Sequence, residues 1–440
     1  MRLSKIVNTV VGSRLRWKFQ PHLKPQIARQ AREELTQLGP TFVKIGQYIS
    51  TRGDLFPTEL VTEFSKLQDT VESFEWDHTQ YPYLTNISPM PIAAASLGQV
   101  HTCTYKGTDC VVKVLRPNIH AQVENDIQNL FILTKFIELL NPSGSRDIVI
   151  FVRELDQMLK LETNYLTEAE NTRNFRKNFK DVDWVIVPEV LYATENILVM
   201  EYVPSVKITE VHGYDKKSLA WALTKAQLMQ VFNTGFFHGD PHPGNVGVYG
   251  GKIVYYDFGM ISEISPQQKK TLLALLVAIT NENEDQILAI ANSMGIISSD
   301  PTGLRTFVRF FLEYIKKNKF ENVKELVAFK NNPLKLNGSF FYLVRSFGLI
   351  EGISKQLDPT YSSSEVLQRY VEENNVMEDA MLMSVQSTYN DITGFSYRLS
   401  NIEKRVKRYH KDDFQRNLLF LLLLCIILIE NDWIIRLLGE

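Results

Sequence analysis

The chain has 440 residues and a mass of 50.7 kDa, enough for two or three conventional domains or for one two-lobed enzyme with additions. Its 48 Lys and Arg balance 50 Asp and Glu, so the net charge of −2 disfavours a dedicated nucleic-acid binder. The hydrophobic fraction of 44% and the charged fraction of 22% argue against wholesale disorder and against a polytopic membrane protein.

The N-terminal segment is strongly basic. Residues 1–32 contain eight Lys or Arg and no acid, with Leu15, Trp17 and Phe19 interleaved among the bases. Three interpretations stay open: contact with an anionic membrane surface, which we prefer, an organelle-targeting segment, and a solvated helix face. The short apolar stretch at residues 6–11 lacks a following cleavage site, so no secretory signal is expected.

Helices are expected at residues 26–39 and 42–49, followed by a hairpin. From residue 93 the apolar pattern takes a period of two, and the turn-like residues 106–109 separate two β-rich runs that end near residue 115. Cys103 and Cys110 flank this turn and could face one another. We interpret them as buried, inert thiols rather than a redox pair. With Cys425 they make three cysteines without CxxC spacing, so a reducing compartment is the simpler expectation.

Further helices are expected at residues 119–140 and at about 147–178, separated by a break at residues 141–144. Short strands follow at 185–187 and 197–202. After residue 214 the chain is mainly helical, except for the Gly- and Pro-rich residues 239–251 and a strand at 252–256. Strands that come before most of the helices indicate an α+β chain with a small sheet-containing lobe and a larger helical lobe.

The C-terminal region contains an unbroken apolar run at residues 418–429, followed by a second apolar patch at 433–438. A helix of 12 residues is about 18 Å long, which is short of the roughly 30 Å hydrocarbon core of a bilayer. We expect either an interfacial or re-entrant anchor or a terminal helix docked on the protein itself.

Five polar residues occur in the order in which kinases use them. Lys113 lies on the second strand of the hairpin, and Glu168 is the helix acid expected to orient it. Asp240 is followed five residues later by Asn245, and Asp257 begins an Asp-Phe-Gly after a strand. Phosphoryl transfer needs these groups: Lys113 for the α and β phosphates, Asn245 and Asp257 for Mg²⁺, and Asp240 for the acceptor hydroxyl or water.

Two further assignments belong to this pattern. His238 and His242 are four residues apart, but Pro241 and Pro243 exclude the helix of a zinc protease, so we interpret the histidines as loop structure. The adenine is expected to contact the strand between the lobes, at Met200, Glu201 and Val203.

The segments at residues 44–47, 91–101 and 238–245 closely resemble the UbiB family of atypical, protein-kinase-like proteins, and the match extends over about residues 39–260. The resemblance implies that an Ala-rich loop, Ala93, Ala94, Ala95 and Ser96, replaces the usual Gly-rich nucleotide loop. It also implies that Lys44 and Gln47 lie over the cleft where a peptide would otherwise bind, with Glu162 paired to Lys44. Alanine adopts positive φ less easily than glycine, so this loop should handicap ordinary transfer.

One residue departs from the family pattern. The expected Glu-x-Asp is Glu162-Thr163-Asn164 here, so Asn164 removes one carboxylate and weakens any metal role at that position. The cyanobacterial and plastid branch is the most similar, and family members are associated with ubiquinone, plastoquinone and other prenyl lipids at membranes.

We therefore expect an α+β, bilobal protein-kinase-like fold with a helical N-terminal extension. The expected parts are the basic extension at residues 1–90, the N-lobe at 91–205, the C-lobe at 206–385 and the C-terminal helices at 386–440. The expected function is that of an atypical kinase or ATPase that uses ATP and Mg²⁺. Its expected partners are a prenyl-quinone precursor or another lipid, a bacterial, thylakoid, plastid or other organelle membrane, and biosynthetic-complex proteins. A pseudokinase that acts as a nucleotide-gated lipid-binding or scaffolding protein is the alternative, and a protein kinase is disfavoured.

Overall fold

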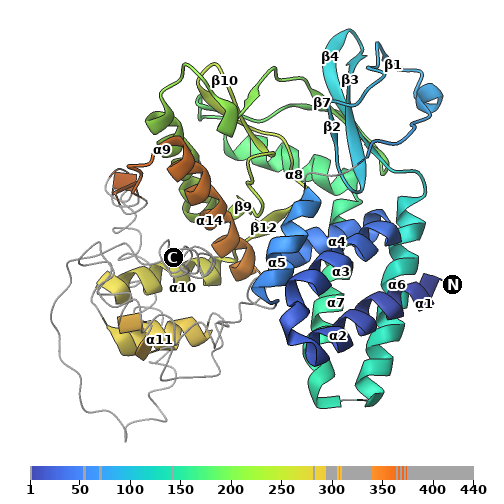
Figure 1. The fold of residues 1–440 in the computed structure, drawn as a ribbon. Helices are drawn as coiled ribbons and strands as arrows, with labels where there is room; N and C mark the ends of the chain where they lie inside the picture. Colours follow the sequence, from blue (N-terminus) through green and yellow to red (C-terminus); the bar gives the residue numbers. More distant parts are fainter. Residues whose placement is uncertain are drawn as a thin grey trace, which may run out of the picture. The chain divides into compact units, whose positions relative to one another are not determined.

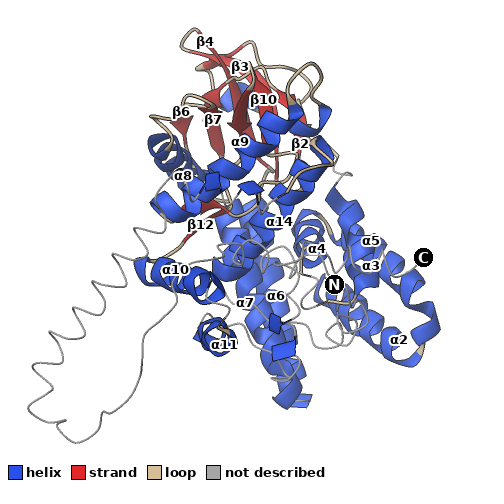
Figure 2. Ribbon diagram, turned by 90° about the vertical axis from the view of Figure 1, so that its left-hand side faces the viewer, coloured by secondary structure: helices blue, strands red, loops and turns tan. Residues whose placement is uncertain are grey.

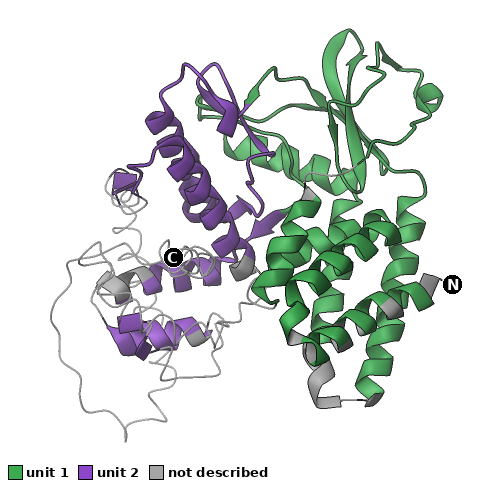
Figure 3. Ribbon diagram, viewed as in Figure 1, with its two compact units in different colours: residues 1–206, 254–260 green, residues 207–253, 261–440 purple. Residues whose placement is uncertain are grey.

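The computed structural model describes residues 2–293 apart from 53–55, 69–71, 141 and 281–282, and then 305–306, 308–309, 339–362, 365–366, 369–370 and 373. It divides into two units, which are described separately (Figure 3). Unit 1 contains residues 1–206 and 254–260, and unit 2 contains residues 207–253 and 261–440. The apolar run at residues 418–438 lies outside the described residues.

An antiparallel sheet forms one part of unit 1 (Figure 1). Its strands follow the order β1-β3-β4-β7-β6, and β2 also pairs with β3. The bounds are β1 Leu84–Thr85, β2 Ala93–Ala94, β3 Gly98–Tyr105, β4 Thr108–Leu115, β6 Val190–Ala193 and β7 Ile197–Glu201. The expected hairpin is β3 and β4, and its turn consists of Lys106 and Gly107, with φ of 49° and 82°. Positive φ at both central residues matches the right-handed twist of the strands, so a two-residue turn suffices.

The two faces of this sheet are covered by different apolar side chains. In β7, Ile197 and Val199 belong to a cluster that includes both cysteines of the hairpin. Leu198 and Met200 belong to a second cluster, which includes Phe42 and other residues of the helices. Because side chains alternate along a strand, these consecutive buried residues indicate a strand with both faces covered.

Helices form most of the rest of unit 1, and three of the expected helices, at residues 26–39, 42–49 and 119–140, have the expected bounds or nearly so. The bounds are α1 Arg2–Val7, α2 Ser13–Phe19, α3 Lys24–Leu38, α4 Pro40–Ser50, α5 Thr58–Ser65, α6 Ile119–Leu140, α7 Pro142–Glu162 and α8 Tyr165–Asn178. The expectation of one helix over residues 147–178 is wrong, because the chain breaks at Thr163 and Asn164. Asn164 Oδ1 accepts a hydrogen bond from the Thr167 backbone N–H at 3.1 Å, which caps the start of α8.

In unit 2, helices α9 and α14 lie side by side (Figures 1 and 2). Gln227 of α9 donates a buried hydrogen bond to the Ser346 hydroxyl of α14 at 2.8 Å. The bounds are α9 Lys216–Met229, β9 Phe236–His238, β10 Val246–Tyr249, β12 Ile261–Glu263, α10 Pro266–Thr280, α11 Glu284–Ser293 and α14 Ser339–Leu357. Strand β11, Lys252–Tyr255, carries the chain from unit 2 back to unit 1. Two further short strands are β5, Val185–Ile186, and β8, Val206–Lys207. Among the described helices, none combines the length and apolar character that crossing a membrane requires.

A close approach at the start of β3 predicts a sensitive position. A methyl group added at Gly98 would lie 2.6 Å from the Tyr165 hydroxyl and 2.6 Å from the Val114 carbonyl oxygen. We expect Gly98→Ala to lower the unfolding free energy by about 1–3 kcal/mol, because backbone must move to relieve the overlap. Chemical denaturation measures this loss. Gly107→Asn is the control, since nothing lies within 4 Å of that position and Asn tolerates positive φ. Equal losses in the two variants would contradict the prediction.

Candidate functional site

The centre of the candidate site in unit 1 is the ammonium group of Lys113. Its Nζ donates to a carboxylate oxygen of Glu168 and, at 2.9 Å, to Oδ2 of Asp257. Lys113 is on β4, Glu168 is in the first turn of α8, and Asp257 follows β11. The Lys113 and Glu168 side chains are only 11% and 5% exposed, whereas Asp257 is 40% exposed. The structure thus brings together three residues that are distant in sequence, and one of the two acids faces solvent.

Burial and charge compete in this cluster. Burial lowers the pKa of Lys113, but Asp257 and Glu168 outweigh it, so that the pKa of the lysine is raised and its charge is retained. Burial also raises the pKa of Glu168, to about 7, although Lys113 opposes that shift. Glu168 is therefore a carboxylate whose ionisation depends on the neighbouring cation.

Helix α8 also holds the Asp-Phe-Gly segment in position. The Phe258 backbone N–H donates to Glu168 Oε1 at 3.2 Å, and its carbonyl oxygen accepts from Asn171 Nδ2 at 3.0 Å. The Phe258 ring is fully buried, with its centroid 5.0 Å from that of Phe175. Sequence reasoning missed Asn171. Its position three residues after Glu168, on the same helix face, is the signal that could have identified it.

The Ala-rich loop is joined to the helical extension. Ala93 and Ala94 form β2, and the Ser96 hydroxyl is buried and donates to Gln47 Oε1 at 3.4 Å. Arg116 donates to the Ser96 carbonyl oxygen at 2.8 Å. Ala93, Ala94 and Ala95 are exposed. The contact with Gln47 restricts the loop at its fourth residue, where a glycine-rich loop would depend on backbone freedom.

Lys44 and Glu162 form an ion pair within unit 1. Their side-chain atoms Nζ and Oε1 are 2.5 Å apart, and the side chains are 20% and 18% exposed. This pair connects α4 to the end of α7. Asn164 lies two residues after Glu162 and is the N-cap of α8. The residue that departs from the family pattern therefore stands at the start of a helix.

The residues expected at the adenine contact lie on and after β7. Met200 is 2% exposed and pairs in register with Val111 of β4. The Glu201 side chain is 3.7 Å from Arg176, and the Val203 carbonyl oxygen accepts from the Ser205 hydroxyl at 3.0 Å. The structure therefore assigns Glu201 a charge partner on α8.

In unit 2, Asp240 is paired with a residue that sequence reasoning missed. Asp240 Oδ1 is 2.7 Å from Arg345 Nη2, and the side chains are 14% and 12% exposed. Arg345 comes from α14, 105 residues further along the chain. A lone cation inside the apolar run at residues 340–350 is a signal for such a partner, because an unpaired charge would be expensive to bury there.

The rest of the loop in unit 2 is organised by its own polar groups. Asn245 Nδ2 donates to the Asp240 carbonyl oxygen at 3.1 Å, which leaves the amide oxygen as the acceptor. An amide oxygen is a hard donor of the kind that Mg²⁺ prefers. His238 Nδ1 and His242 Nδ1 accept from the backbone N–H groups of Asp240 and Gly244, at 3.1 and 3.0 Å. These bonds agree with the interpretation of the histidines as loop structure.

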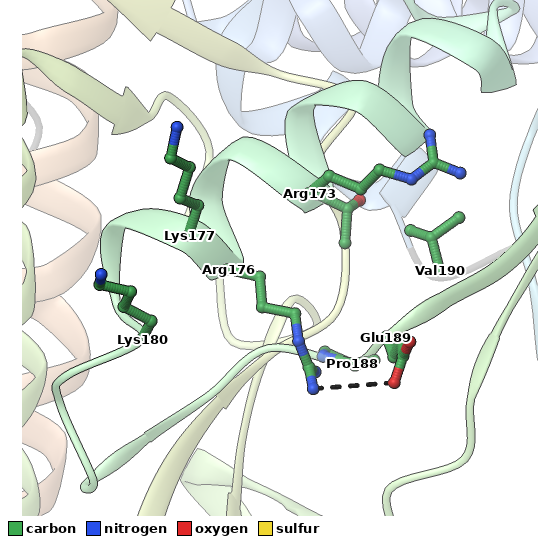
Figure 4. Close-up of a pocket in the computed structure, with 8 residues that line it drawn as sticks. Arg173, Arg176, Lys177, Lys180, Pro188, Glu189 and Val190 are labelled. Carbon is green, nitrogen blue, oxygen red and sulfur yellow. Dashed lines mark ion pairs between the residues drawn. The ribbon is translucent and has the colours of Figure 1, made fainter.

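A pocket of about 380 Å³ lies against the C-terminal half of α8, and none of the predicted site residues lines it (Figure 4). Arg176 points toward Glu189, with 3.8 Å between the two charged groups. Arg173, Lys177 and, beyond the end of the helix, Lys180 point in other directions, so the four cations do not converge on one point. We therefore do not assign the phosphates to this pocket.

The Glu168 pKa makes a prediction about stability and pH. Its folded value of about 7 lies above the ordinary 4.5, so the folded state binds this proton more tightly. The contribution of Glu168 to stability should therefore decrease as pH rises from about 4.5 to 7, by about 3 kcal/mol at most. Glu168→Gln should lack this decrease, and denaturant unfolding of the nucleotide-free protein across pH 5–8 measures it. The exposed Glu170→Gln is the control. Parallel pH profiles for wild type and Glu168→Gln would refute this prediction.

The pairing of Asp240 makes a second prediction. Arg345→Gln removes a charge-assisted hydrogen bond from a largely buried carboxylate, and we expect the unfolding free energy to fall by about 2 kcal/mol. Arg345→Lys should recover part of this loss. Arg309→Gln is the matched control, because its side chain is 61% exposed and its ion pair with Glu284 should contribute less than about 1 kcal/mol. If the two Gln variants lose equal stability, the Asp240 pair is no stronger than an exposed one.

Comparison with known proteins identifies the family. The model of the ABC1 atypical kinase-like domain matches residues 62–291. A protein of Arabidopsis thaliana named ACTIVITY OF BC1 COMPLEX KINASE 7, chloroplastic, is 32% identical over 438 residues, which cover 90% of this chain and 63% of that protein. An uncharacterized protein of the cyanobacterium Synechocystis is 34% identical over 434 residues, covering 89% of this chain and 74% of that one.

A solved structure gives information about the fold alone. The chain of Rv3197 from Mycobacterium tuberculosis, solved with erythromycin, is 22% identical, with a TM-score of 0.51. The likeness covers 63% of this chain and 75% of that chain. It agrees with the α+β, bilobal kinase-like fold expected from sequence. The chain belongs to the ABC1 atypical kinase-like family, which is the UbiB family that its motifs resemble.

Proposed function

We propose that this protein is an atypical kinase or ATPase that binds ATP with Mg²⁺. The observation that carries the proposal is the cluster in which buried Lys113 pairs with buried Glu168 and with the partly exposed Asp257. A lysine oriented by a helix glutamate and an Asp-Phe-Gly aspartate are the groups that kinases require to hold phosphates. In this proposal Lys113 contacts the α and β phosphates, and Asp257 and Asn245 hold the metal. Bound Mg²⁺ would offset the charge of the phosphates.

Asp240 has the role of orienting the acceptor hydroxyl or water. Its carboxylate is held by Arg345 at 2.7 Å, and its backbone is held by His238 at 3.1 Å. A carboxylate fixed at both its side chain and its backbone loses little freedom when an acceptor binds, which supports a positioning role for the loop. The acceptor itself is proposed to be a lipid or prenyl-quinone precursor, as the family resemblance implies.

Association with a membrane is part of the proposal. The N-terminal segment contains eight Lys or Arg and no acid, and Phe19 at the end of α2 is 72% exposed. Basic and exposed aromatic side chains together favour the interface of an anionic bilayer. The Arabidopsis relative is named chloroplastic, and this chain spans 63% of its length. We propose a plastid, thylakoid or bacterial membrane as the site of action.

A pseudokinase is the second candidate, and the contact between Gln47 and Ser96 favours it. Through this contact the helical extension holds the Ala-rich loop in place. Movement of the loop over the phosphates would then be limited. A polypeptide acceptor is disfavoured, because β12 follows Met260 directly and α10 begins at Pro266, which leaves little length for an activation segment.

Two variants separate these functions. Lys113→Ala should abolish the rise in melting temperature that Mg-ATP gives wild type, since ligand at 100 times its Kd adds about 2.7 kcal/mol to stability. Lys180→Ala is the control, because that side chain is 70% exposed and has a partner only at 3.8 Å. If Mg-ATP raises the melting temperature of Lys113→Ala as much as that of wild type, Lys113 does not contact the nucleotide.

Asp240→Asn should retain Mg-ATP binding and lose ATP consumption, measured with and without anionic liposomes. Consumption by wild type that Asp240→Asn abolishes supports an enzyme. Binding without consumption in wild type under either condition would favour the pseudokinase.

A further inference from the structure

Two thiols lie in contact within the sheet of unit 1. Cys103 of β3 and Cys110 of β4 are directly opposite in register, and their Sγ atoms are 3.0 Å apart. Both are free cysteines, with 4% and 1% of their surfaces exposed. A disulfide has an S–S length of about 2.0 Å, so a movement of about 1 Å would connect them.

The backbone already has the spacing that a disulfide needs. Opposite residues of antiparallel strands have Cα atoms about 4.5–5.5 Å apart, and disulfides span about 4.4–6.8 Å. The register is continuous from the Gly98 and Leu115 pair to the Tyr105 and Thr108 pair. Rotation of the two side chains would therefore be enough, without displacement of either strand.

We propose that Cys103 and Cys110, which the sequence alone suggested to be inert thiols, are a dithiol site that exchanges with an external disulfide to form a reversible cross-strand disulfide. The thiolate of Cys110 attacks the external disulfide RS–SR, breaks its S–S bond and releases one RSH after protonation. Cys103 then attacks the Cys110 sulfur of the mixed disulfide and releases the second RSH. The cysteines lose two electrons and two protons, and RS–SR gains them as two thiols.

The order of these two steps follows from the hydrogen bond between the thiols. The Cys103 thiol stabilises a thiolate at Cys110 and lowers the pKa of Cys110, while the same interaction raises the pKa of Cys103. These directions make Cys110 the expected nucleophile of the pair, because only the thiolate attacks a disulfide.

Access requires only local opening. The pair lies two residue pairs from the tight turn, since Thr104 opposes Asp109 and Tyr105 opposes Thr108. The outer side of β3 is covered there by β1, which pairs only through Leu84 and Thr85. The turn of this hairpin is at one extremity of unit 1 (Figure 1). Ends of strands open at lower free energy than the centre of a sheet, so a small disulfide reaches Cys110 without global unfolding.

The test uses the full chain with Cys425→Ser, so that only the pair can react. The protein is equilibrated in glutathione buffers of increasing oxidised fraction and quenched in acid. It is then unfolded and treated with N-ethylmaleimide, and its intact mass is measured. Oxidation should lower the mass of the protein by about 2 Da and leave no thiol for N-ethylmaleimide to alkylate. Dithiothreitol should restore the original mass and both alkylation sites. Peptide mapping of the unsubstituted chain, with a link between residues 103 and 110, is the second measurement and does not depend on the Cys425 variant.

Two controls keep the outcome specific. Cys103→Ser and Cys110→Ser, in the same background, should each retain one alkylated thiol or one glutathione adduct and never show the 2 Da loss. Hydrogen exchange at residues 98–115 should become slower on oxidation in the protein with both cysteines, and stay unchanged in the single variants. Two free thiols at the most oxidising ratio, or glutathione adducts without an internal link, would overturn the proposal.

Discussion

The buried charge of Lys113 is the constraint on which the arrangement of unit 1 depends. An ammonium group removed from water costs several kcal/mol unless opposite charges surround it. Here the compensation comes from Glu168, 55 residues away in sequence, and Asp257, 144 residues away. Strand β4, helix α8 and the segment after β11 must therefore converge at one point. Because Glu168 also accepts the Phe258 N–H, a single carboxylate positions both the lysine and the Asp-Phe-Gly segment.

The helical extension is bound to this centre by polar contacts rather than by apolar packing alone. Lys44 pairs with Glu162, and Gln47 accepts a hydrogen bond from Ser96 of the Ala-rich loop. Arg52, only 4% exposed at its side chain, adds an ion pair with Glu154 at 2.7 Å. The Ala-rich loop, which corresponds to the flexible glycine loop of other kinases, is thus held by a helix that is not part of the sheet. Charge-assisted contacts of this kind specify geometry, since their energy falls steeply when the partners separate.

Unit 2 solves the same electrostatic problem with its own residues. Arg345 offsets the charge of Asp240, and Asn245 donates a hydrogen bond to the Asp240 carbonyl oxygen, so both contacts of this loop lie within unit 2. In unit 1, the β3–β4 hairpin has two chemical features on one short element. Its second strand presents Lys113 to the acids and Cys110 to the opposite thiol, and the two residues are three positions apart in the sequence. An odd spacing places them on opposite faces of the strand, so thiol chemistry and charge pairing are kept apart.

The sequence by itself determined the elements whose signals are local. A period of two on both sides of Lys106 and Gly107 was enough for the hairpin, and the apolar pattern of residues 119–140 was enough for α6, because side-chain alternation and turn conformation act over a few residues. The order of the polar motifs also indicated the family. Only the tertiary structure decided that Asn164 starts a new helix, that Asn171 holds Phe258, and that Arg345 pairs with Asp240. These contacts depend on which buried polar groups the folded chain brings within hydrogen-bond distance, and no periodicity in the sequence encodes that distance.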